Sequence, residues 1–181
     1  MTLRQAHLQR QQSECFDVAI VGGGINGAAA ATALTHRGLR VALIDSGDFA
    51  SQPSQASSNL VWGGIKYLEN YEFGLVRKLC RSRNALMRAY PSRIREIRFF
   101  VLHDADFRHS LRKLHLGAQL YWWMGNQRTL PPRRFSTQAL QREMPIVSPG
   151  RFDGALEYSD AYFFDSDARF VFQMLRSALD H

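Results

Sequence analysis

Three glycines occur at a spacing that can hold the diphosphate of a dinucleotide. Gly22, Gly24 and Gly27 form a GxGxxG pattern directly after the short apolar run 16–21. The first glycine permits a tight turn, the second lets a pyrophosphate approach the backbone, and the third lets a helix pack closely against a strand. Free N–H groups at the start of that helix suit the phosphate charges. The residues predicted to bind the dinucleotide here are Gly22, Gly23, Gly24, Ile25, Asn26 and Gly27.

One acidic residue completes this pattern. Asp45 follows Gly27 by 18 residues and stands at the end of a second apolar run, 39–44. A carboxylate at this place accepts hydrogen bonds from the hydroxyls of an adenosine ribose, and it repels a 2′-phosphate. The pattern therefore disfavours an NADP-type ligand. The glycine turn alone does not decide between FAD and NAD.

The surrounding elements have the order that such a turn requires. Residues 16–21 predict a buried strand, 28–36 a helix that ends before Gly38, and 39–44 a second strand, which together make a βαβ unit with parallel strands. Ser136 is predicted to cap a short helix that runs to Met144, and Ser166 or Asp165 to cap a last helix. The other predicted elements are a helix over 72–90, a strand over 97–102, a helix over 110–124 and a strand over 153–158.

Composition and charge exclude several classes of protein. Of the 181 residues, 45% are hydrophobic and 22% charged, which is typical of a folded globular chain. No apolar run is long enough for a membrane-spanning helix, and two cysteines make no disulfide framework, as expected in a reducing cytoplasm. The histidines show no spacing typical of a metal site, so we expect no metal.

The net charge of +7 comes from one segment. Residues 72–134 carry fourteen Lys or Arg and four Asp or Glu. Within it, residues 107–135 mix Arg, Lys and His with Leu, Trp and Tyr, a pattern that a helix lying on an anionic membrane surface uses. The same pattern also fits a helix packed in a core with a solvated basic face. No nucleic-acid-binding motif accompanies it, so we expect no nucleic-acid partner.

In four stretches the chain resembles the FAD-dependent glycerol-3-phosphate dehydrogenase family, a group of DAO-type oxidoreductases. The stretches are FDVAIVGGGINGAAAA, LIDSGDFAS, ASSNLVWGGIKYLENYEFGLVR and GALEYSDAYFFDSDAR. The likeness extends from Phe16 to the end of the chain and is weak between Arg98 and Pro149. It implies an α/β fold: an incomplete Rossmann-like FAD/NAD(P)-binding fold with part of an inserted substrate or cap region.

The resemblance also implies an activity. Family members hold FAD and transfer a hydride from C2 of glycerol 3-phosphate to the flavin, which gives dihydroxyacetone phosphate, and the electrons then pass to a quinone. The expected location is the cytoplasm, with peripheral contact to the inner face of the membrane through 107–135. Homodimer formation stays open. By its length the chain is expected to be the N-terminal portion of an enzyme two to three times longer, inactive alone.

Further FAD contacts follow from the resemblance. They are Ser57, Ser58, Asn59, Trp62, Gly63 and Gly64. Lys66 is the one candidate for a cation on the substrate or flavin side, and no other catalytic residue is assigned. The chain departs from the family at Asn59, Trp62 and Lys66, where relatives have Lys, His and Arg. These departures leave open a flavoenzyme for another hydroxy or amino substrate. A separate alternative is a truncated, non-catalytic dinucleotide-binding module.

The last matching stretch contains polar residues that we expect to act in turns, helix capping and an ion pair rather than in catalysis. They are Tyr158, Asp160, Asp165, Asp167 and Arg169. The domain organisation expected from all these patterns has four parts. These are a flexible N-terminal arm (1–15), an FAD-binding βαβ region (16–95), a basic and aromatic inserted region (96–150) and the start of a return to the FAD domain (151–181).

Overall fold

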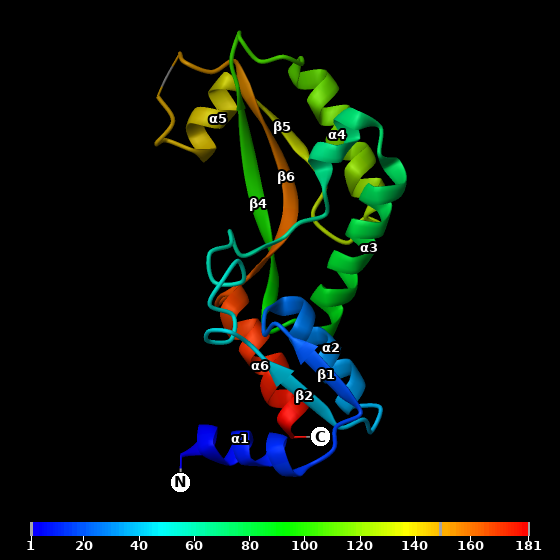
Figure 1. The fold of residues 1–181 in the computed structure, drawn as a ribbon. Coiled ribbons are helices and arrows are strands. Elements are labelled where there is room, and N and C mark those ends of the chain that lie inside the picture. Colours follow the sequence, from blue (N-terminus) through cyan, green and yellow to red (C-terminus); the bar gives the residue numbers. More distant parts are fainter. Residues whose placement is uncertain (1, 149, 181) are drawn as a thin grey trace. The chain divides into compact units, whose positions relative to one another are not determined.

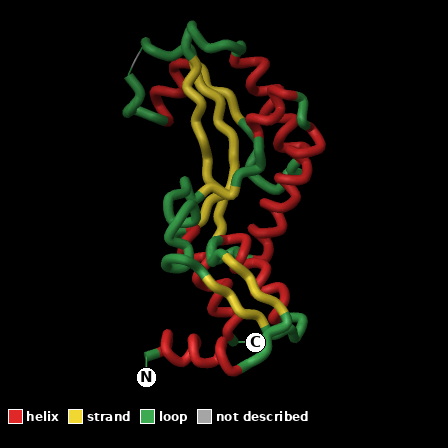
Figure 2. The backbone as a smooth tube through the Cα atoms, in the orientation of Figure 1, coloured by secondary structure: helices red, strands yellow, loops and turns green. Residues whose placement is uncertain are grey.

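The computed structural model describes residues 2–148 and 150–180, and it comprises two compact units. The first unit contains residues 2–59 and 165–180, and the second contains 60–148 and 150–164. Figure 1 shows the helices and strands of each, and Figure 2 shows the strands as yellow segments of the backbone. Both units mix helices with sheet, as an α/β fold requires.

The first unit contains the predicted βαβ arrangement. Strands β1 (Val18–Val21) and β2 (Val41–Ile44) are parallel, with Val18 opposite Val41 and Val21 opposite Ile44. Helix α2 (Ile25–Thr35) connects them (Figure 1). Runs of β-branched residues form the strands, and an alanine-rich run forms the helix. The prediction of two parallel strands joined by a helix is therefore confirmed.

Helix α6 (Asp167–Leu179) packs on α2 within the first unit. The Thr32 hydroxyl donates a hydrogen bond to the Met174 carbonyl at 2.8 Å. Ala28, Val171 and Leu175 are buried in the same cluster. The small alanine side chains let the two helices approach closely. The last part of the chain, from residue 165, thus lies in the same unit as the glycine turn, whereas the sequence placed the start of this segment at residue 151.

The N-terminal residues are helical, although their sequence shows no apolar period. Helix α1 (Leu3–Ser13) begins with a capping box: the Gln5 N–H donates to the Thr2 hydroxyl at 3.3 Å, and the Thr2 N–H donates to the Gln5 side chain at 2.9 Å. Gln and Arg are good helix formers without being apolar. Apolar periodicity therefore does not identify this exposed helix, whereas its capping box does.

The second unit is built on an antiparallel sheet. Its central strand β6 (Gly154–Phe163) pairs along its whole length with β4 (Ile94–His103), and the two strands lie side by side in Figure 1. Two short strands, β3 (Leu60–Val61) and β5 (Arg133–Ser136), pair with the other edge of β6. The short strands were not expected because two or four residues carry no readable alternation.

Helices cover this sheet in two groups. Helices α3 (Phe73–Ala89) and α4 (Leu111–Met124) lie together beside the sheet (Figure 1), and the 3-10 helix η1 (Ile65–Asn70) packs against both. Helix α5 (Thr137–Glu143) covers Phe135 and Ala155 near the other end. Residues 60–95 thus belong with 96–164, whereas the sequence placed them with the dinucleotide region. The pairing of β3 with β6 is the physical reason.

The predicted caps Ser136 and Ser166 are present at the starts of α5 and α6, and Ser110 caps α4 in the same way. The hydroxyl of each serine accepts a hydrogen bond from the backbone N–H three residues later. Asp165 and Arg169 form the expected ion pair, at 3.7 Å. Within the described residues, no helix combines the length and apolar character needed to cross a membrane.

Candidate functional site

The turn between β1 and α2 has the geometry that the glycine pattern predicts. Gly22 has a φ of +107°, a conformation that a residue with a Cβ rarely adopts. A Cβ added at Gly27 would overlap the carbonyl oxygen of Gly22, so α2 can approach the strand only because Gly27 lacks a side chain. Gly24 is the N-cap of α2 and leaves the helix start open, without a capping side chain of its own.

The start of α2 offers hydrogen-bond donors. The N–H groups of Asn26 and Gly27 lie in the first turn, where an α-helix has no internal acceptor for them. The Ile25 N–H donates to the Ser54 hydroxyl at 3.2 Å. Sequence reasoning missed Ser54, because a serine in an irregular segment 29 residues away carries no spacing signal. This donor set, at the positive end of the helix dipole, fits a diphosphate.

Asp45 lies at the end of β2 and is connected to the glycine turn. Its carboxylate accepts the Gly23 N–H at 2.6 Å and the Gly47 N–H at 2.8 Å. The Gly23 hydrogen bond is the main reason why the pKa of Asp45 is below its ordinary value, so the group is ionised at neutral pH. Each carboxylate oxygen can accept more than one hydrogen bond, which leaves room for a ribose hydroxyl. Asp45 is therefore in place for the role that the sequence predicts.

The three residues predicted from 57 to 59 have local roles as well. The Ser57 hydroxyl accepts the Asn59 N–H at 3.0 Å. Asn59 has a φ of +57°, and its side-chain oxygen accepts the N–H of Asp167 at 3.1 Å, at the start of α6. Asn59 thus helps to cap α6, which a capping asparagine does well. Ser57 and Ser58 are exposed, so their hydroxyls are accessible to a ligand.

The remaining predicted contacts belong to the second unit. Gly63 and Gly64 are buried, and Gly64 has a φ of +84° where the chain turns into η1. The Trp62 ring lies 5.6 Å from the Tyr67 ring, centroid to centroid, in a tilted arrangement. Lys66 is exposed on η1. Trp62 is thus part of a small aromatic group, while Lys66 presents a cation to the surroundings.

A buried ionic cluster lies beside Gly63, and no spacing pattern in the sequence predicted it. Asp160 is fully buried and accepts hydrogen bonds from Arg83 at 3.0 Å, from the Tyr121 hydroxyl at 2.8 Å and from the Gly63 N–H at 3.1 and 3.2 Å. Arg83 is 1% exposed and also donates to Asn84. Asp160 was expected to serve in a turn, a cap or an ion pair rather than in catalysis. It forms an ion pair, with Arg83, but it lies within β6 and not in a turn or cap.

The electrostatics of this cluster follow from its burial. Loss of water raises the pKa of Asp160, and the ion pair with Arg83 opposes that rise. Burial also raises the pKa of Tyr121, which therefore keeps its proton. Every group bonded to Asp160 is a donor, so the acceptor-only carboxylate form fits the site. The cluster is thus a neutral ion pair fixed by hydrogen bonds.

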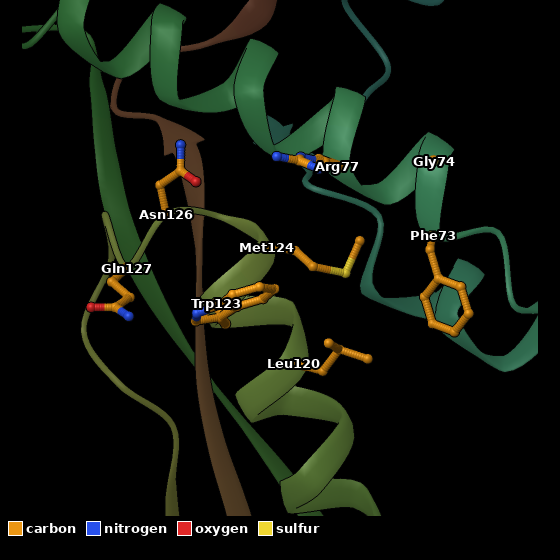
Figure 3. Close-up of a pocket in the computed structure, with 8 residues that line it drawn as sticks. All are labelled: Phe73, Gly74, Arg77, Leu120, Trp123, Met124, Asn126 and Gln127. Carbon is orange, nitrogen blue, oxygen red and sulfur yellow. The ribbon is translucent and has the colours of Figure 1, made fainter.

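A groove of about 720 Å³ runs between α3 and α4 in the second unit (Figure 3). Its lining residues are Phe73, Gly74, Arg77, Leu120, Trp123, Met124, Asn126 and Gln127. On α4, Leu116, Leu120 and Trp123 form an exposed apolar stripe, with Leu116 69% and Trp123 67% accessible, while Tyr121 is turned inward. The helix therefore packs by one side and exposes apolar residues on another.

The family of the chain follows from its match to known proteins. The family model for FAD dependent oxidoreductases matches residues 17–181. The chain belongs to the FAD-dependent oxidoreductase family. FAD is the cofactor of this family, and the open helix start, the close Gly22–Gly27 approach and Asp45 all fit its adenosine diphosphate half. Within the described residues, no group of three His, Cys, Asp or Glu side chains is arranged to hold a metal.

Two curated relatives of this family member are dehydrogenases by name. It is 36% identical over 180 residues to glycerol-3-phosphate dehydrogenase of Pseudomonas aeruginosa, covering 99% of this chain and 34% of that protein. It is 38% identical over 163 residues to D-erythritol 1-phosphate dehydrogenase of Brucella abortus, covering 88% of this chain and 31% of that protein. The chain thus spans about a third of the length of these curated relatives.

Solved structures show the same fold at low identity. Glycerol-3-phosphate dehydrogenase from Bacillus halodurans, complexed with FAD, superposes with a TM-score of 0.67 at 17% identity and covers 98% of this chain and 27% of that one. L-alpha-glycerophosphate oxidase from Mycoplasma pneumoniae, with FAD bound, superposes with a TM-score of 0.65 at 20% identity. The match covers 92% of this chain and 43% of that one. The expected partial Rossmann-like FAD-binding fold is confirmed.

Proposed function

We propose that the first unit binds the adenosine diphosphate half of FAD. We also propose, from the family resemblance, that Trp62, Gly63 and Gly64 are flavin contacts. The observation that carries the proposal is the glycine turn, where Gly24 leaves the start of α2 without a capping side chain of its own and Asp45 stands at the end of the next strand. Asn26 and Gly27 donate their N–H groups to the phosphates, and Asp45 accepts from the ribose. Bound FAD supplies the acceptor for a hydride.

The proposed reaction is the oxidation of glycerol 3-phosphate to dihydroxyacetone phosphate, with a quinone as final electron acceptor. The relatives act, by their names, on glycerol 3-phosphate and on D-erythritol 1-phosphate, which share a hydroxylated carbon chain and a phosphate. Lys66, an exposed cation two residues after the glycine pair, is proposed to meet that phosphate. A lysine gives a point charge where the family's arginine gives a two-pronged donor.

Two departures from the family favour testing other substrates. Trp62 places an apolar ring where the family resemblance implies a histidine, so no acid–base role is available at that position. Asn59 is engaged in capping α6 and carries no charge. A flavoenzyme for another hydroxy or amino substrate is therefore the second candidate. A panel of glycerol 3-phosphate, erythritol phosphate, glycerol and an amino acid, scored by anaerobic bleaching of the flavin-loaded protein, separates the two candidates.

The test of FAD binding is a titration of the purified protein with FAD, followed by flavin fluorescence. The double variant Asp45→Ala/Gly24→Val removes the ribose acceptor and fills the approach to the backbone, so we expect affinity to fall at least about a hundredfold. The control is Asp48→Ala, which removes an exposed carboxylate from the same loop. Equal affinity of the double variant and the wild type would contradict the proposed site.

We also propose that the stripe of Leu116, Leu120 and Trp123 contacts the inner face of the membrane, where a quinone is reached. Exposed Trp and Leu beside Arg and Lys are suited to anionic headgroups. Flotation with vesicles of phosphatidylglycerol and phosphatidylcholine tests it: Leu116→Ser/Trp123→Ser should lose binding, and Phe172→Ser, which removes an exposed aromatic from α6, should retain it. Sedimentation of the same samples reports whether the protein forms a homodimer.

A further inference from the structure

Both polar backbone groups of Gly63 are directed into the interior of the second unit. The N–H donates to the two carboxylate oxygens of Asp160 at 3.1 and 3.2 Å. The carbonyl accepts a weak hydrogen bond from the Cys80 thiol at 3.6 Å. A peptide segment held on both sides in this way has little freedom to shift. Gly63 is therefore held by the buried side chains of Asp160 and Cys80, which are distant from it in the sequence.

Asp160, which binds the Gly63 N–H, is itself held by further hydrogen bonds. Arg83 donates to Asp160 and to the Tyr121 hydroxyl, both at 3.0 Å. The other side of its guanidinium donates to Asn84, whose amide donates to the Gly125 carbonyl at 2.7 Å at the end of α4. The cluster thus joins α3, α4 and β6 through groups that have no water to bind instead. Breaking any of these bonds leaves a buried polar group without a partner.

No space separates this cluster from the glycine. A Cβ added at Gly63 would overlap the Tyr121 hydroxyl and lie 2.9 Å from the Arg83 guanidinium. At Gly64, an added Cβ would lie 2.6 Å from Leu79. A displacement of Tyr121 or Arg83 is therefore transmitted directly to the backbone of the glycine pair.

We propose that Asp160, with Arg83 and Tyr121, is a positioning group that fixes the 62–64 segment against the flavin ring. This inference rests on the proposed function, since it takes the flavin to lie at Trp62, Gly63 and Gly64. A buried ion pair is a poor source of stability, because the loss of hydration offsets the attraction. The pair does hold the Gly63 N–H in one position, because that group donates to Asp160. Apolar side chains of the same volume would not hold it. The cluster acts through Gly63 and does not touch the cofactor.

The test compares two tyrosines of the same cluster of side chains. Tyr121→Phe keeps the ring and removes one donor to Asp160. The control, Tyr158→Phe, changes a ring 6.4 Å away, centroid to centroid, whose hydroxyl is not among the donors to Asp160. A second control, Leu140→Ala, weakens the α5 side of the same unit far from Gly63. The readouts are FAD affinity by titration, the visible flavin spectrum, and hydrogen exchange at the Gly63 amide.

Tyr121→Phe should lower FAD affinity about fivefold, the equivalent of one lost hydrogen bond. It should also shift the flavin absorption bands and speed exchange at Gly63, while both controls keep the wild-type affinity and spectrum. Unchanged affinity and spectrum in Tyr121→Phe would overturn the positioning role and leave the proposed function intact. No FAD binding by the wild type would overturn the proposed function itself.

Discussion

Replacing Asp160 by asparagine tests whether Arg83, left buried without its anion, destabilises the second unit. The substitution keeps the size of the side chain and removes its charge. Arg83, 1% exposed, then keeps a positive charge with no anion beside it, and Tyr121 and Gly63 compete for one remaining oxygen. Removing one partner of a buried pair costs about 3–5 kcal/mol. That is a large share of a domain stability of about 5–15 kcal/mol.

Urea unfolding followed by tryptophan fluorescence measures this loss in the free energy of unfolding of the second unit. The three tryptophans, Trp62, Trp122 and Trp123, all lie in the second unit. The control is Glu143→Gln, which breaks an exposed ion pair with Arg133 at 3.8 Å; with both side chains more than half exposed, its loss should be below about 1 kcal/mol.

A double variant tests the physical cause. If the destabilisation comes from an unpaired buried charge, Arg83→Met in the Asp160→Asn background should recover part of the lost free energy of unfolding, because it removes that charge. A single Asp160→Asn variant that unfolds within about 1 kcal/mol of the wild type would refute this reasoning.

Three more outcomes are expected in the first unit, the first of them compared with a glycine on α4 of the second unit. Gly27→Ala should lose about 1–3 kcal/mol by urea unfolding followed by circular dichroism, since its Cβ overlaps the Gly22 carbonyl, whereas Gly117→Ala, with open space around it, should gain about 0.5–1 kcal/mol. The lowered pKa of Asp45 means that its stabilising hydrogen bonds are fully present above about pH 4 and are lost as the pH falls through the folded pKa; in an acid titration Asp45→Asn should lose this dependence. Ser166→Ala should destabilise α6 by about 0.5–2 kcal/mol, seen as a lower melting temperature, and an unchanged one would contradict its capping role.

Local signals account for much of what the sequence predicted correctly. The strand, turn and helix around Gly22 and Gly27 were predictable because each depends on residues within about ten positions. The same holds for Ser136 and Ser166, whose hydroxyls bond N–H groups three residues away. The helix at 3–13 was missed because its capping box, not apolar periodicity, was the signal present.

The sequence by itself determined the dinucleotide turn, since conformational freedom at Gly22 and the absence of a Cβ at Gly27 are properties of the residues themselves. Only the tertiary structure decided the role of Asp160, which the sequence presents as one more acidic residue near a turn. Its partner Arg83 lies 77 residues away, and what gives the pair its effect is the removal of water by α3, α4 and β6 together. Burial is a property of the packed elements, and no local pattern encodes it.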